Sequence, residues 1–139
     1  MTVRTWLYSQ LIDPLNLDLF SLIEDRVYAK KSMQSSVSEH PYVVFKLGNA
    51  TNEEIAETVD VYRQFIQIFV HDFTDDTVGD YSRIDEVVRA IKKKLINSQS
   101  PVDGVVTVKF LETSQDLNDE TLSTVMKYIR FQIIVKESK

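Results

Sequence analysis

The sequence predicts an α+β protein with a mainly antiparallel sheet and helices packed on one face. Several segments alternate apolar and polar residues with the two-residue period of a strand, and strand segments mostly follow one another along the chain. One later segment changes to the helical period, with apolar residues at Ile84, Val87, Val88, Ile91 and Leu95. Strands that follow strands favour antiparallel pairing, with the helices as a separate layer.

The chain is predicted to open with two helices. Val3, Leu7 and Leu11 recur at helical spacing, and Pro14 is expected to stop the first helix because it disfavours helical geometry at the residue before it. A second, short helix is predicted to start near Asn16 or Asp18. A short strand over 26–29 and an exposed polar loop over 30–40 are expected to follow.

Two strands come next. The first has Val43, Phe45 and Leu47 on one face and is predicted to end in a turn at 48–49. The second is long, over 59–73, and both of its faces are largely apolar: Val61, Phe65 and Phe69 on one, and Tyr62, Ile66, Ile68 and Val70 on the other. A single helical layer covers one face, so the other needs a second partner, either a neighbouring subunit or loops folded over it.

The rest of the chain is predicted as a helix, two strands and connections. Lys92–Lys94 lie near the end of the helix, where cations suit the helix dipole. A strand is expected over 105–111 and an acidic polar loop over 112–124. The last strand, over 127–136, has four apolar residues on one face, with Arg130, Gln132 and Lys136 on the other. One domain over 1–139 is expected.

Composition excludes several kinds of chemistry. The 139 residues include no cysteine, three glycines and two histidines. These counts argue against disulfides, thiolate metal sites, a glycine-rich phosphate loop and a three-histidine metal site. No apolar run is long enough to span a membrane, and a protein assembled in the cytoplasm is expected. We therefore expect no enzyme activity, no cofactor and no metal.

Two features have competing interpretations. His71 and Asp72 could form a base and its orienting carboxylate, but adjacent strand residues point to opposite faces. The basic cluster of Arg89 and Lys92–Lys94 could contact phosphates, or it could simply suit the end of its helix. The net charge of −5 weakens a general nucleic-acid interpretation.

Three segments at strand ends carry acids and no basic residue. Like charges gathered at one edge repel a polyanion, which suits a conduit through which DNA slides. The alternative is that these are solvated loops. The acids predicted to form a lumen or rim are Glu53, Glu54, Glu57, Asp72, Asp75, Asp76, Glu112, Asp116, Asp119 and Glu120.

Taken in order, the segments resemble the tail-terminator, or tail-completion, proteins of long-tailed bacteriophages. The resemblance covers nearly the whole chain and rests on the order WLYSQLIDP (6–14), SLIEDRVYA (21–29), HPYVVFKLG (40–48), VYRQFIQIFVHDF (61–73), YSRIDEVVRAIKKKL (81–95), VVTVKFLETSQDLNDE (105–120) and YIRFQIIVKE (128–137). It implies a structural virion protein that forms a homo-hexameric ring on the tail tube protein. The ring would end tube growth and join the tail to the head connector or stopper protein, with DNA passing through its lumen without specific binding.

This resemblance implies where subunits meet. Tyr62, Ile66 and Ile68 are expected at the subunit interface, with Arg63 and Arg130 as charged partners across a rim. On this hypothesis Ile66→Asp leaves a folded monomer that cannot form rings. The loops over 30–40 and 112–124 are expected to contact tube or neck proteins.

Three other functions remain open. The nearest is another neck component, such as a stopper or head-completion protein. A small nucleic-acid-binding module that uses residues 89–94 predicts steep salt dependence of DNA affinity. An enzyme with a hidden carboxylate site predicts a pocket of convergent, strongly perturbed acids.

Overall fold

The residues that the structure describes form three helices and a six-stranded sheet, with more strand than helix. The computed structural model describes residues 2–29, 41–55, 59–73, 81–100, 104–119 and 124–138. In chain order, the elements are α1 (Val3–Leu11), α2 (Leu17–Ile23), β1 (Val27–Ala29), β2 (Tyr42–Ile55), β3 (Val59–Phe73), α3 (Tyr81–Asn97), β4 (Gly104–Thr113), β5 (Leu117–Asp119) and β6 (Thr124–Ser138). The predicted order of helices and strands is confirmed, while the predicted loop over 30–40 lies outside the described residues.

The strand order is β1-β2-β3-β6-β4, and β5 pairs with β6 beyond the end of β4. Among the strand pairs that the structure describes, β1 and β2 alone are parallel, and they pair over three residues from Val27 opposite Val43 to Ala29 opposite Phe45. The pairs β2–β3, β3–β6 and β4–β6 are antiparallel. The sheet is therefore mainly antiparallel, as the succession of strands predicts.

Two predicted boundaries are wrong. The strand expected to end at Gly48 continues to Ile55, because a bulge between Leu47 and Ala50 keeps β2 paired with β3 past the glycine. A Cβ at Gly48 would lie 3.3 Å from the Cβ of Phe65, so only glycine fits this close approach without displacement. The loop expected over 112–124 is shorter, because it contains β5 and the end of β4.

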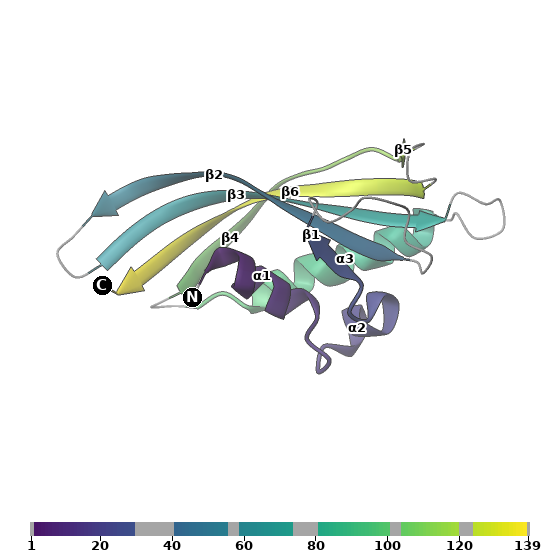
Figure 1. The fold of residues 1–139 in the computed structure, drawn as a ribbon, viewed down its shortest axis with the longest axis horizontal. Coiled ribbons are helices and arrows are strands. Elements are labelled where there is room, and N and C mark those ends of the chain that lie inside the picture. The colour runs from purple at the N-terminus through teal and green to yellow at the C-terminus, as the bar shows by residue number, and fades with distance from the viewer. Residues whose placement is uncertain are drawn as a thin grey trace.

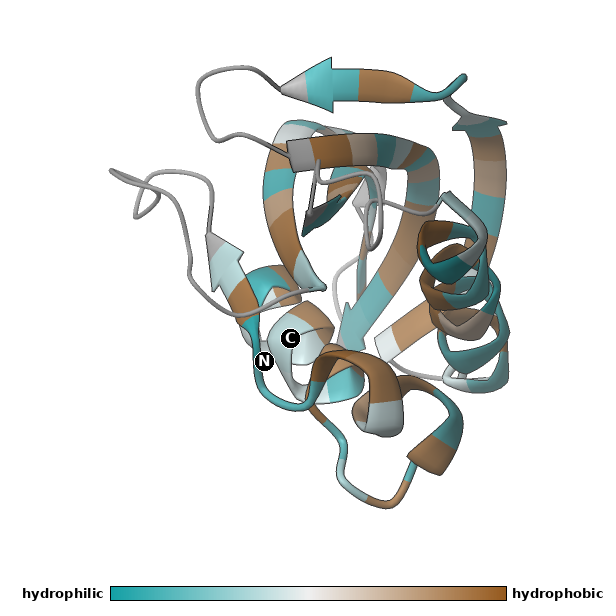
Figure 2. Ribbon diagram, turned by 90° about the vertical axis from the view of Figure 1, so that its right-hand side faces the viewer, coloured by the Kyte–Doolittle hydropathy of each residue, from teal (hydrophilic) through white to brown (hydrophobic). Residues whose placement is uncertain are grey.

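All three helices lie on the same side of the sheet (Figure 1). Apolar and polar residues alternate along the strands (Figure 2), and the apolar set on the helix side forms the core. β6 contributes Ile129, Phe131, Ile133 and Val135, all fully buried, to this core. The apolar stripe of α3 packs against them, with Ile84, Val87, Ile91 and Leu95 also fully buried.

The first helix contains the predicted apolar stripe and ends before Pro14, as the sequence predicts. The Thr2 hydroxyl accepts a hydrogen bond from the backbone N–H of Thr5 at 3.1 Å, which satisfies one of the unpaired amides at the start of α1. The helix ends at Leu11, before Pro14. None of the described helices is both long and apolar enough to cross a lipid bilayer.

Candidate assembly surfaces

The sheet has two edges at which the described strands have no neighbour. β1 covers β2 only at Val43–Phe45, so within the described residues the outer edge of β2 is unpaired from Lys46 onward. At the opposite edge, β4 pairs with β6 and with no other described strand. Edge strands present rows of backbone N–H and C=O groups that can pair with another chain. We call these the β2 edge (Lys46–Asn52) and the β4 edge (Gly104–Thr113).

The two edges lie at the same height along the strands. Successive register pairs place Lys46 in one row with Gln67, Arg130 and Glu112. In the same way, Thr51 of β2 and Thr107 of β4 lie in a second row, across Arg63 and Ile134. The unpaired part of β2 and the unpaired side of β4 therefore lie at opposite edges of the sheet but extend over the same rows of residues.

The face of the sheet away from the helices carries an aromatic group at one end. Tyr42 is fully buried and stacks on His71, with ring centroids 4.8 Å apart. Phe69 packs against Tyr128 at 6.0 Å. Phe65, further along β3, is 38% exposed. We call this side of the sheet the outer face.

The predicted subunit contacts on β3 are wrong for two residues. Ile66 and Ile68 are 1% and 0% exposed and belong to the core beneath the helices, so they offer no surface to a neighbour. The sequence showed two apolar faces on this strand but not which one the helices would cover. Tyr62 lies on the same side and is half-buried, and burial together with its hydrogen bond to Glu137 raises the pKa of its phenol. Arg63 and Arg130 project from the outer face instead, since their neighbours along each strand point into the core.

The predicted acidic rim is also wrong at Asp72. This carboxylate is fully buried and receives two hydrogen bonds from Arg83 of α3, from Nε at 2.8 Å and from Nη2 at 2.5 Å. The Arg83–Asp72 ion pair connects the start of α3 to the end of β3, and Asp72 has no contact with solvent. His71 points to the outer face and Asp72 to the helix side, so the two do not form a base and its orienting carboxylate.

Two other predicted rim acids are engaged in ion pairs. Glu112 lies 3.4 Å from Arg130 and accepts a hydrogen bond from the Tyr128 hydroxyl, which raises the pKa of Tyr128. Asp116 lies 3.2 Å from Lys127. The remaining predicted acids have no described side chain, namely Glu53, Glu54, Glu57, Asp75, Asp76, Asp119 and Glu120.

The basic cluster on α3 makes contacts within the chain. Lys94 Nζ lies 2.7 Å from Asp13 Oδ2, and this hydrogen bond is the largest cause that lowers the pKa of Asp13. Lys93 pairs with Asp18 at 3.4 Å, and Lys92 lies 5.7 Å above the ring of Phe110. These contacts join α3 to α2, to the α1–α2 connection and to β4. They favour the structural interpretation of the cluster over phosphate binding.

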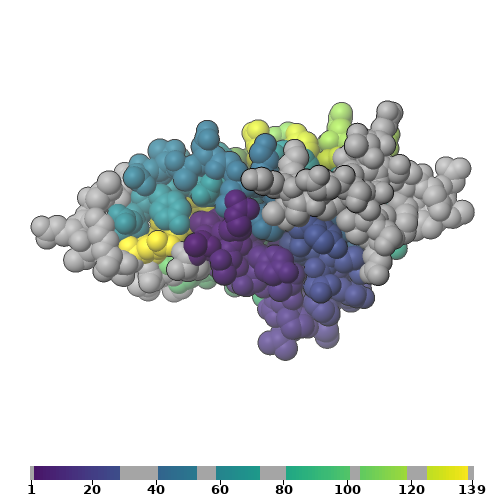
Figure 3. All heavy atoms as spheres, in the orientation of Figure 1, coloured from purple at the N-terminus to yellow at the C-terminus, as the bar shows by residue number. Residues whose placement is uncertain are grey.

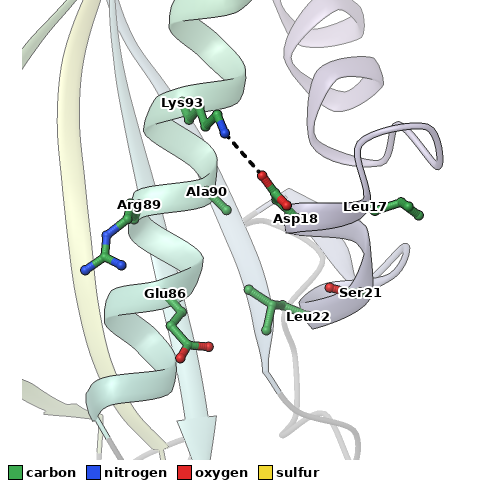
Figure 4. Close-up of a pocket in the computed structure, with 8 residues that line it drawn as sticks. All are labelled: Leu17, Asp18, Ser21, Leu22, Glu86, Arg89, Ala90 and Lys93. Carbon is green, nitrogen blue, oxygen red and sulfur yellow. Dashed lines mark hydrogen bonds and ion pairs between the residues drawn. The ribbon is translucent and has the colours of Figure 1, made fainter.

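An open groove of about 650 Å³ separates α2 from α3 (Figure 4). The ion pair between Lys93 and Asp18 spans one end of it. Next to the groove, the α1–α2 connection and the start of α2 protrude from the body of the molecule (Figure 3). Leu15 of the connection and Leu17, the first residue of α2, are 89% and 71% exposed. Among the described residues, no three His, Cys, Asp or Glu side chains are grouped closely enough to hold a metal ion.

Lys127 connects three elements on the helix side. Its Nζ lies 2.7 Å from Asp85 of α3 and 3.2 Å from Asp116 of the β4–β5 connection. The hydrogen bond to Asp85, followed by the bond to Asp116, raises the pKa of Lys127 above its ordinary value of 10.5. A base whose pKa is higher in the folded chain stabilises the fold at every pH below its unfolded value. The contribution is lost as the pH rises through the raised pKa.

We therefore expect the advantage of the wild type over Lys127→Met to depend on pH. The difference in free energy of unfolding should stay constant at neutral pH and shrink above 10.5, which urea denaturation followed by circular dichroism would measure. Lys136→Met is the matched control, since Lys136 is an exposed lysine on the same strand. A difference for Lys127→Met that stays constant through this range would contradict the assigned ion pairs.

Comparison with known proteins identifies a fold and no family. No protein-family model matches the chain, and no curated protein matches it. Among solved structures, the chain is similar to a chain of a structure titled "Virion of native gene transfer agent (GTA) particle", with a TM-score of 0.63. The two share 18% sequence identity, and the match covers 94% of this chain and 91% of the other. At this identity the likeness shows that the fold is shared.

Proposed function

We propose that this chain is a structural protein of a phage-like virion, one that forms a ring at the head-proximal end of the tail. The observation that carries the proposal is the fold match to a chain in a gene transfer agent virion, which extends over 94% of this chain and 91% of the other. Two proteins matched almost end to end share an architecture rather than one common motif. A structural role, with no catalysis and no resident cofactor, follows from this proposal.

The two sheet edges support assembly by self-association. β2 and β6 run in one direction and β3 and β4 in the other. If a rotation places the β4 edge of one copy beside the β2 edge of the next, the two strands run antiparallel and continue the alternation. Such contacts join two different edges, so they propagate from copy to copy and close into a ring when the rotation closes.

The ring would end the growth of the tail tube through the shapes of its two surfaces. It pairs with the last ring of the tail tube and presents a different surface on its other side, so tube subunits no longer add. We propose a hexamer, the order that the resemblance to tail terminators implies, with the tail tube protein and a connector or stopper protein as partners. DNA would pass through the opening.

The main test is electron microscopy of tails assembled with and without this protein. A terminator is expected to leave tubes of uniform length when present and overlong tubes when absent. Uniform tubes in its absence would contradict the terminator role.

A stopper or head-completion protein is the second candidate, since a virion chain of this fold could belong to either part of the neck. Binding to purified tail tubes supports the terminator role, and binding to emptied capsids supports the stopper role. A sedimentation assay with the two particles in parallel distinguishes them.

A further inference from the structure

The described part of the outer face of the sheet is basic, although the chain as a whole is acidic. The described side chains assigned to this face by strand alternation include five basic residues and one acidic residue. The basic ones are Lys46 on β2, Arg63 on β3, Lys109 on β4, and Arg130 and Lys136 on β6, and the acidic one is Glu112. The net charge of −5 therefore does not describe this surface.

The basic side chains are spread over four neighbouring strands. Lys46 and Arg130 lie in one row, separated by Gln67, so they are about 10 Å apart at the usual strand spacing. Between them is a shallow depression of about 150 Å³, which Phe65 and Gly48 also line. Arg130 is 53% exposed, and its contact with Glu112 at 3.4 Å lies between two exposed side chains, so it contributes little to stability. This arginine can turn to another anion at low cost.

We propose that the outer face is a contact surface for the phosphate backbone of duplex DNA. Charges spread over a broad sheet suit a ligand with regularly repeated negative charge, and such binding needs no sequence readout. The amides of Gln67 and Gln132 lie among the cations and add donors of the kind that contact phosphate oxygens. The alternative ligand is a folded acidic protein. An interface with such a protein would need complementary shape and a centre of apolar residues that become buried on binding. Of the exposed large apolar side chains described, only Phe65 lines the depression between Lys46 and Arg130, and it is 38% exposed.

The place of this face in a ring rests on the proposed function. If the β2 and β4 edges join copies, one side of the sheet lines the opening and the other faces outward. The helices widen the subunit on one side (Figure 1), and the wider side fits the larger outer circumference. The basic face then lines the opening and contacts DNA in transit. This replaces the expectation of an acidic lumen.

The test is fluorescence anisotropy of a labelled duplex of random sequence, titrated with the full chain at several salt concentrations. Wild type is expected to bind more weakly as salt rises. The double variant Lys46→Gln/Arg130→Gln is expected to reduce the slope of log affinity against log salt by about 1.8, since each lost phosphate contact removes about 0.9. Lys109→Gln/Lys136→Gln should act in the same direction, and circular dichroism shows whether either pair folds.

The matched control is Arg89→Gln/Lys93→Gln, which removes the same charge from the exposed surface of α3. It is expected to leave affinity and slope unchanged. Equal losses in the control and the outer-face variants, or no salt-dependent binding by wild type, would overturn the proposal. So would outer-face variants that keep DNA affinity but no longer bind tail tubes, which would assign the face to a protein partner. Light scattering on the same samples reports ring formation separately, so a failed ring and a failed DNA contact are distinguishable.

Discussion

Replacing Ile66 with aspartate is expected to unfold the protein rather than to leave a folded monomer. Ile66 is 1% exposed and lies in the core between β3 and the helices. An unpaired carboxylate there loses its hydration without gaining a partner, at a cost of several kcal/mol. The free energy of unfolding of small domains is only about 5–15 kcal/mol, so the variant loses most or all of its stability. Loss of the circular dichroism signal and of a cooperative urea transition would be the measurement.

The matched control is Leu17→Asp. It makes a similar apolar-to-acid change at a side chain that is 71% exposed, where the effect should stay within about 0.5 kcal/mol. A well-folded Ile66→Asp protein would show that the helices do not cover this side of β3. Its unfolding would also mean that this substitution cannot report on ring assembly, which needs changes at the sheet edges instead.

Cysteines placed on the two sheet edges should cross-link neighbouring copies into a closed ring. The chain has no cysteine, so every disulfide formed would be an introduced one. Thr51 and Thr107 are both exposed, lie on the same face and occupy the same row of the sheet. A disulfide forms only when the two Cβ atoms come within about 3.5–4.5 Å. Thr51→Cys/Thr107→Cys is therefore expected to give a ladder of covalent oligomers on a non-reducing gel, whose largest member counts the subunits.

The single variants separate this arrangement from a two-fold dimer. In a head-to-tail ring neither Thr51→Cys nor Thr107→Cys alone forms a disulfide. If two β2 edges pair with each other, Thr51→Cys alone yields dimers and no ladder. Because closed barrels shift neighbouring strands along one another, Thr51→Cys/Lys109→Cys tests the register two residues away. No ladder in either pair, with rings present by light scattering, would exclude edge pairing as the ring contact.

The order of elements could be predicted from the sequence because each depends on local patterns. The stripe from Ile84 to Leu95 has the helical period, and its side chains are buried as that pattern requires. The alternation in β6 also assigns both faces correctly, with Ile129 and Phe131 inward and Arg130 outward. These features need no knowledge of which strands are neighbours.

The surfaces could not be predicted in the same way, because they depend on contacts between distant segments. Asp72 looked like one more acid at a strand end, and only the fold brings Arg83 to it. Both faces of β3 are apolar, so the pattern did not decide whether Ile66 or Phe65 would meet the helices. The basic outer face draws residues from four strands, and the only hint in the sequence was the polar side of β6. The register pairs were needed to collect them.

The three residues of β1 have a consequence for how an assembly would be built. β1 covers β2 at Val43–Phe45 and so prevents a neighbouring copy from pairing with that part of the strand. Any strand pairing between copies is then confined to the half of β2 near the β2–β3 connection. In a closed ring, neighbouring copies would then pair near one rim and have no strand pairing near the other. Its two rims would therefore differ in how closely neighbouring copies are joined.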